Sequence, residues 1–214
     1  MEGTNLSLFM SIAIPMAITL LIFKGRSRIS MLFVIVGMAV CLFTGEINTL
    51  IFNFTKLEMK YYVVNVSPFV EELCKSVPLF LYAYILRPKK QDVLESAVSL
   101  GVGFAVLENA AVLAEYGGMN VLVRSFGSGL MHAITALWIG CGIIFVYLNR
   151  KLFYTGSFAI LISAAIFHSA YNALIGSSYE IVGLLLPIIT LVPLSELLIK
   201  KGINKKNTIQ KGEI

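Results

Sequence analysis

Charged residues are scarce in this sequence: they make up 14% of its 214 residues, whereas hydrophobic residues make up 57%. Water-soluble domains typically carry about 25% charged residues, and a soluble fold of this size could not remove so much apolar surface from water. The scarcity excludes an ordinary soluble domain and indicates a protein embedded in the lipid bilayer of a cell membrane. No long polar stretch interrupts the apolar segments, so we expect one transmembrane domain.

Cysteine and the common catalytic motifs are also rare or missing. Cys41, Cys74 and Cys141 lie in apolar segments without a CxxC pair, which excludes a disulfide framework. There is no HExxH motif and no phosphate-binding loop, and no Ser-His-Asp or Cys-His pair is compelling. The net charge of +5 comes from short basic runs between apolar segments, a pattern typical of cytoplasmic loops rather than of a nucleic-acid-binding protein.

Long apolar runs, by contrast, are abundant, and a membrane span needs about 20 apolar residues. The first run follows Glu2 and precedes Lys24 and Arg26, the reverse of the charge order of a signal peptide, so we expect it to be a retained helix. The sequence predicts an all-α, polytopic transmembrane helical bundle of about seven spans. Their approximate residues are 4–23, 30–51, 62–86, 93–114, 121–148, 153–175 and 181–199.

The basic residues between these spans fall mainly on one side of the membrane. With seven spans, 13 basic residues lie on one side and 3 on the other, and Lys75 lies within a span. Cytoplasmic loops carry the excess of lysine and arginine, so we expect the N-terminus outside and the C-terminus in the cytoplasm. The basic tail at 200–214 is then expected to lie against anionic lipid headgroups.

Several polar residues lie well inside the predicted spans, although each charged one costs roughly 2.5–3.5 kcal/mol at a helix centre. A rise of 1.5 Å per residue puts the glutamates and histidines among them, from five helices, about 8 to 15 Å below the outer surface, with Asn172 shallower. A shared depth predicts one site that is open to the outside. The residues are Glu46, Glu71, Glu72, Lys75, Glu108, Asn109, His132, His168 and Asn172.

Helical spacing predicts some partners within this set. Lys75 is within reach of both Glu71 and Glu72, and we expect Glu46 and Lys75 to be structural partners rather than catalysts. Interhelical hydrogen bonding explains a single intramembrane histidine equally well, and Asn109 can likewise join helices. Close approach of helices is expected at glycines 101, 103, 140 and 142.

Four motifs follow one another on successive predicted helices: Glu71-Glu72-Leu73-Cys74-Lys75 (EExxK), Phe104 with Glu108-Asn109 (FxxxEN), His132 followed eight residues later by Gly140, and His168 with Tyr171-Asn172 (HxxYN). In this order the series resembles the PrsW family of membrane proteases, part of the superfamily of CAAX prenyl proteases and bacteriocin-processing enzymes. The resemblance covers about residues 66–175. CAAX-type members carry EExxxR and FxxxH instead, so processing of prenylated proteins is not expected.

The resemblance implies an intramembrane endopeptidase that cuts a single-pass membrane protein, typically an anti-sigma factor, near the extracytoplasmic face. Residues 1–214 then form a single transmembrane protease domain with its motif core at 66–175. A proton- or cation-coupled transporter that uses the same acids and histidines as a relay is the alternative. A catalytically silent member that acts through membrane interactions is a third possibility.

Our hypothesis for the chemistry gives Glu71 the role of base on the attacking water, with Glu72 beside it and Glu108 assisting. The resemblance implies that His168 and Asn172 donate to the oxyanion. His132 would orient the water or protonate the leaving amine, and the expected supporting residues are Glu46, Lys75, Phe104 and Asn109. Glu71, Glu108, His132 and His168 could also hold Zn²⁺, but the absence of HExxH favours chemistry without a metal.

Overall fold

The computed structural model describes residues 2–20, 22–116, 119–148 and 153–191, which fold into helices with no strand among them. The helices are α1 (Glu2–Thr19), α2 (Gly25–Thr55), α3 (Met59–Asn65), α4 (Ser67–Leu86), α5 (Lys90–Tyr116), α6 (Met119–Leu148) and α7 (Phe153–Ile175). A further apolar helix covers Glu180–Leu191. The predicted all-α class is confirmed, whereas the tail at 200–214 and the end of the seventh predicted span lie outside the described residues.

Four segments of the described chain are long and apolar enough to cross a membrane: Gly25–Thr55, Lys90–Glu115, Ser125–Phe145 and Thr155–Ile175. The chain is therefore a multi-pass membrane protein. Helix α4, at 20 residues, is also about 30 Å long, enough for a span, but it carries three charged residues of the EExxK motif. The count of seven spans and the orientation of the termini remain predictions.

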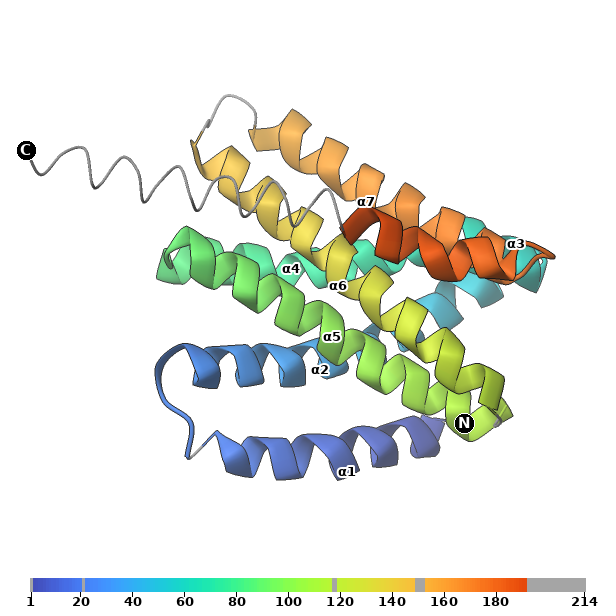
Figure 1. Ribbon diagram of the computed structural model, residues 1–214, viewed down its shortest axis with the longest axis horizontal. Helices are drawn as coiled ribbons and strands as arrows, with labels where there is room; N and C mark the ends of the chain where they lie inside the picture. Colours follow the sequence, from blue (N-terminus) through green and yellow to red (C-terminus); the bar gives the residue numbers. More distant parts are fainter. Residues whose placement is uncertain (1, 21, 117–118, 149–152, 192–214) are drawn as a thin grey trace, which may run out of the picture.

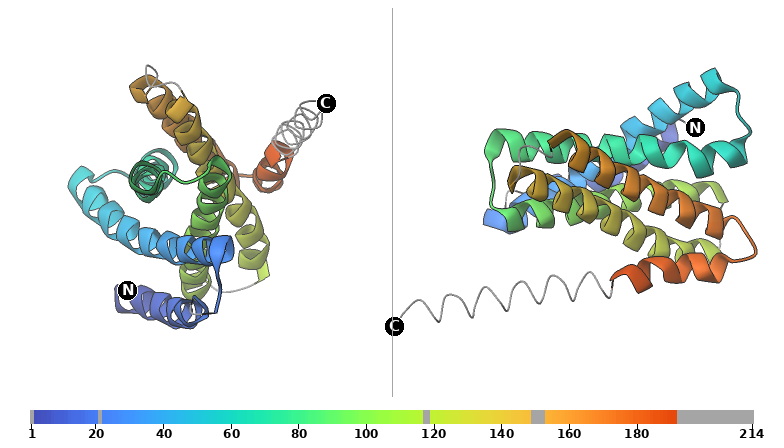
Figure 2. Two further views of the ribbon diagram at one scale, coloured as in Figure 1. Left: turned by 90° about the vertical axis from the view of Figure 1, so that its left-hand side faces the viewer. Right: turned by 90° about the horizontal axis from the view of Figure 1, so that it is seen from above.

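The helices lie roughly alongside one another, with α5 between α2 and α6 (Figures 1 and 2). Glycine allows these helices to approach closely, because a side chain at Gly37 of α2 would meet the backbone of Leu100, and one at Gly103 of α5 would meet the backbone of Val34. Gly101, on α5, lies against the backbone of His132 on α6. The predicted close approaches at Gly101 and Gly103 are thus confirmed, and Gly140 and Gly142 also lie against neighbouring side chains.

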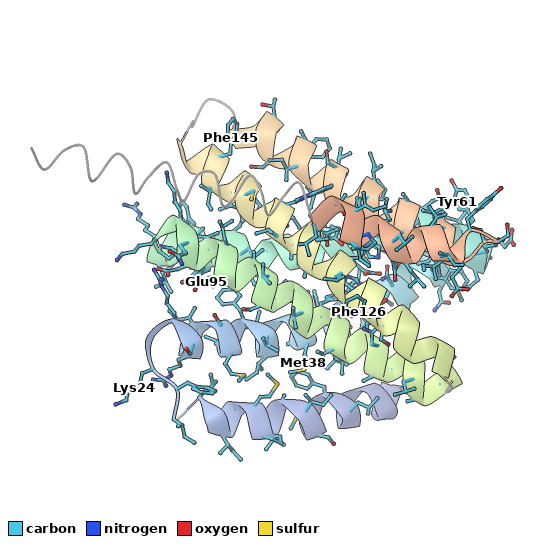
Figure 3. All side chains as sticks on the ribbon, viewed as in Figure 1. Lys24, Met38, Tyr61, Glu95, Phe126 and Phe145 are labelled. Carbon is cyan, nitrogen blue, oxygen red and sulfur yellow. The ribbon has the colours of Figure 1, made fainter. Side chains whose placement is uncertain are left out.

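The two halves of the bundle differ in polarity. At one end, Arg26 of α2 forms an ion pair of 2.7 Å with Asp92 of α5, and Figure 3 shows Lys24 and Glu95 near this end and Tyr61 near the other. An apolar core that includes Phe33, Leu79, Ala83, Val93 and Ile143 fills the half next to the ion pair. This core leaves the polar residues of the motifs to the opposite half.

The predicted third span, 62–86, is divided into two helices. Helix α3 ends at Asn65, and Val66, with φ −112° and ψ −52°, caps both α3 and the start of α4. Pro68 occupies the first turn of α4. Proline is favoured in a first turn because its missing N–H has no partner there. The division places Ser67 at the start of α4, one helical turn before Glu71.

Candidate active site

Four helices bring the predicted ionisable residues together in one buried cluster. Helix α4 contributes Glu71, Glu72 and Lys75, α5 contributes Glu108, α6 contributes His132 and α7 contributes His168. The chain has only two histidines, and their rings lie 5.0 Å apart in an edge-to-face arrangement. Residues from four of the five helices in the predicted site therefore lie in contact with one another, and the exception is Glu46 of α2.

Lys75 is at the centre of the cluster and is completely buried. Its Nζ donates to Oε1 of Glu72 across 2.9 Å and lies 2.6 Å from Nδ1 of His132. The ammonium also lies 4.2 Å from the centroid of the Phe104 ring, a cation–π distance. The helical spacing allowed either Glu71 or Glu72 as the partner of Lys75, and in the structure the partner is Glu72.

His132 connects Lys75 with the glutamate of the FxxxEN motif. Its Nε2 lies 2.5 Å from Oε2 of Glu108, and the hydroxyl of Ser128, one turn earlier on α6, lies 3.5 Å from the same oxygen. The Phe104 ring packs against His132 with 4.9 Å between centroids. Glu108, with 31% of its side chain exposed, is the most exposed of the six ionisable residues in the cluster.

His168 lies between the two glutamates of α4. Its Nδ1 is 2.8 Å from Oε1 of Glu72, and its Nε2 is 3.8 Å from Oε2 of Glu71. A carboxylate can only accept, so Nδ1 carries the hydrogen and Nε2 of the neutral ring keeps its lone pair. The open nitrogen of His168 therefore faces Glu71.

Glu71 has one satisfied oxygen and one open oxygen. Ser67 donates to its Oε1 across 2.7 Å, whereas Oε2 is buried and has no hydrogen-bond partner among the residues that the structure describes. Buried polar atoms without a partner are uncommon and costly. The 3.8 Å between this oxygen and Nε2 of His168 is too long for a hydrogen bond and leaves a place for a bridging species.

A divalent metal ion fits these residues. Glu71, His132 and His168 each offer a ligand atom, and the three atoms lie within 4.8 Å of one another. Carboxylate oxygen and imidazole nitrogen are ligands that Zn²⁺ prefers, and both Oε2 of Glu71 and Nε2 of His168 have a lone pair available. Both ring nitrogens of His132 already have partners, Lys75 and Glu108, so His132 could bind a metal only if one of these contacts opened.

Three other predicted residues lie outside this contact network. Asn172 of α7 donates to the carbonyl of Val63 on α3, and Asn109 of α5 donates to the carbonyl of Ser125 on α6. Both asparagines therefore join neighbouring helices. Glu46 is exposed on α2, whereas Lys75 is enclosed by Glu72, His132 and Phe104, so the structure does not pair Glu46 with Lys75.

Sequence reasoning missed three uncharged residues that lead to Glu71. Asn48, Tyr62 and Ser67 lead by hydrogen bonds from α2 and α3 to Glu71. The i,i+4 spacing of Ser67 and Glu71 was a usable signal. No sequence signal indicated the contact between Asn48 and Ser67, because the two residues are 19 positions apart and lie on different helices.

Comparison with known proteins gives one match. The sequence model of the family described as "PrsW family intramembrane metalloprotease" matches residues 25–198, which include all four motifs. Searches of curated proteins and of solved structures found no match.

Proposed function

Because the chain belongs to the PrsW family of intramembrane metalloproteases, we propose that Glu71 activates the water that hydrolyses the peptide bond. Membership of this family supports activity as an intramembrane peptidase. One observation carries this proposal: the buried, unpartnered Oε2 of Glu71 faces Nε2 of His168 across 3.8 Å. One water molecule can bridge two polar groups at such a separation. A carboxylate oxygen in contact with that water is placed to act as a general base.

In the proposed reaction, Oε2 of Glu71 takes a proton from the water as the water oxygen attacks the carbonyl carbon of the scissile bond. The bond between this carbon and the amide nitrogen then breaks, and Glu71 returns the proton to the leaving nitrogen. The same residue serves first as base and then as acid, so the proton count balances. General acid–base catalysis of this kind contributes factors of about 10² to 10⁴.

Glu72 and Lys75 have a different task from Glu71. Glu72 accepts hydrogen bonds from both Lys75 and His168 at the same oxygen, and this fixes the ring of His168 with Nε2 toward Glu71. The positive charge of Lys75 offsets the negative charge of the buried Glu72 carboxylate. We therefore assign the first glutamate of the EExxK motif to the water and the second, with the lysine, to the orientation of His168.

We propose that Glu71 and His168, joined by His132 once its contact with Lys75 or Glu108 opens, hold a divalent metal ion, in keeping with the family's description as metalloproteases. A Zn²⁺ ion supplies Lewis acidity, which eases deprotonation of water and polarises a carbonyl. This proposal differs from the expectation of metal-free chemistry. The tautomer of His168 supports the change, because a lone pair at Nε2 binds a cation but cannot donate to an oxyanion.

We propose a single-pass membrane protein as substrate, of the anti-sigma-factor type that the resemblance implies, cut near the extracytoplasmic face. The location of the cluster among spanning helices supports a substrate that arrives within the bilayer. The exposed fraction of Glu108 favours approach of the polypeptide beside α5. The family match favours a peptidase over the transporter that the same residues allowed.

The test is cleavage in a defined membrane. Wild type, Glu71→Gln and Glu46→Gln are reconstituted into liposomes with candidate single-pass proteins, and fragments are identified by mass spectrometry. We expect Glu71→Gln to reduce cleavage by about 10² to 10⁴ and Glu46→Gln, the same change on the exposed face of α2, to leave it near the wild-type rate. Normal cleavage by Glu71→Gln would refute the assigned base.

A further inference from the structure

A line of hydrogen bonds reaches Glu71 from outside the four motifs. The hydroxyl of Tyr62 on α3 lies 3.0 Å from Oδ1 and 3.0 Å from the backbone oxygen of Asn48 on α2. Nδ2 of Asn48 donates to Oγ of Ser67 across 2.9 Å, and Ser67 donates to Oε1 of Glu71 across 2.7 Å. Three helices thus contribute to one chain of contacts that ends on Glu71.

The donors and acceptors in this chain all point one way. A serine hydroxyl has one hydrogen, and a carboxylate can only accept, so Ser67 gives its hydrogen to Glu71 and accepts from Asn48. The side-chain oxygen of Asn48 is then free to accept from Tyr62. Each group has the partner that its chemistry requires, and consecutive hydrogen bonds of this kind polarise one another.

The burial of these groups indicates that the chain has one stable arrangement. Tyr62 is 3% exposed and Ser67 is 9% exposed, so water cannot readily replace their partners. An unmade hydrogen bond in such surroundings is costly. Asn48 connects α2 to both sides of the division between α3 and α4, and this fixes Ser67 over the first turn of α4.

From this geometry we propose that Tyr62, Asn48 and Ser67 are positioning residues that hold Oε1 of Glu71 and thereby direct Oε2 toward His168. The proposal rests on the proposed function of Glu71 as base, which it deepens. A carboxylate with both oxygens free could rotate about its last bond, whereas one held at Oε1 presents a single oxygen to the reaction.

Three substitutions separate this role from simple packing. Ser67→Ala removes the donor to Glu71, and Ser67→Thr keeps it. Asn48→Asp keeps the size of the side chain but replaces the donor to Ser67 by an acceptor, which would compete with Glu71 for the hydroxyl hydrogen. Ser76→Ala is the matched control, because Ser76 is a buried serine on the same helix whose hydroxyl donates to the carbonyl of Leu73 and not to a residue of the cluster.

Two measurements are made on each variant in liposomes: the infrared band of the Glu71 carboxyl group, identified by its loss in Glu71→Gln, and the kinetics of cleavage. We expect Ser67→Ala and Asn48→Asp to shift the band and to lower kcat by about 10- to 100-fold, the usual effect of losing such a supporting contact, while KM stays unchanged. Ser67→Thr and Ser76→Ala should match the wild type in both.

An unshifted Glu71 band in Ser67→Ala would overturn the proposal, as would a normal kcat in that variant. A fall in activity that Ser67→Thr fails to restore would also count against it. If the wild type cleaves no candidate substrate, the proposed function fails, and the infrared band alone then decides whether Ser67 holds Glu71.

Discussion

Lys75 and His132 are in direct contact, with Nζ of the lysine 2.6 Å from Nδ1 of the imidazole. An ammonium group only donates, so Nδ1 of a neutral His132 accepts, and its Nε2 carries the hydrogen that faces Glu108. Through Glu72 the same lysine also fixes the orientation of His168. One fully buried charge therefore determines how both histidines are presented to the site.

Replacing Lys75 tests this central position. Lys75→Met leaves the carboxylate of Glu72 buried without a cation, and breaking a buried ion pair in this way costs about 3–5 kcal/mol. We expect a lower yield of membrane-inserted protein and a lower melting temperature in detergent. Size-exclusion chromatography and a thermal unfolding assay measure these effects.

The double variant Lys75→Met/Glu72→Gln is the matched control. It removes both charges, so the yield should return toward that of the wild type, whereas cleavage should stay low because an uncharged glutamine holds His168 less firmly. Recovery of cleavage together with yield would show that the pair stabilises the fold without orienting the histidine.

The contact between α5 and α6 at Gly101 gives a second prediction. A Cβ atom there would lie 2.8 Å from the carbonyl carbon of His132 and 2.9 Å from Cα of Ala133, and backbone atoms of packed helices cannot move aside easily. Gly101→Ala should therefore destabilise the protein by about 1–3 kcal/mol and reduce cleavage by displacing His132.

Gly45→Ala provides the comparison, since a Cβ atom at Gly45 on α2 would have no neighbour within 4 Å in the described part of the chain. Alanine is the better helix former by roughly 0.5–1 kcal/mol, so Gly45→Ala should keep or raise the unfolding temperature. Equal stability of Gly101→Ala and Gly45→Ala would contradict the close approach of α5 and α6.

Much of the site could be predicted from the sequence, because charged residues in apolar helices are costly and must meet. Depth along a helix, however, does not determine which way a residue faces. Glu46 has the expected height but lies on the exposed side of α2. Helical spacing also could not decide whether Glu71 or Glu72 is the partner of Lys75. The partner depends on Ser67, one turn earlier on α4, which bonds to Glu71, and on His168 of the distant helix α7, which bonds to Glu72.

The orientation of the chain gives a third prediction, drawn from the 13 basic residues on one side against 3 on the other. The ion pair between Arg26 and Asp92 confirms that the starts of α2 and α5 share one end of the bundle, as the alternation of spans requires. A reporter active only in the cytoplasm should work at the C-terminus, and one active only outside should not. The opposite pair of results would put the glutamates near the cytoplasmic face.

The last prediction concerns the metal ion. Because the chain has only two histidines, protein purified through a tag that contains no histidine can bind Zn²⁺ through imidazole only at His132 and His168. We expect about one Zn²⁺ per chain by mass spectrometry of the metal content, loss of cleavage on treatment with a strong chelator, and recovery on adding Zn²⁺. His168→Ala and Glu71→Ala should each lose most of the bound metal, because each removes one of the proposed ligands. Glu46→Ala should retain it, since Glu46 lies on the exposed face of α2. Full activity after chelation, in protein shown to be free of metal, would instead return the chemistry to Glu71 acting without a metal, with its open Oε2 as the base.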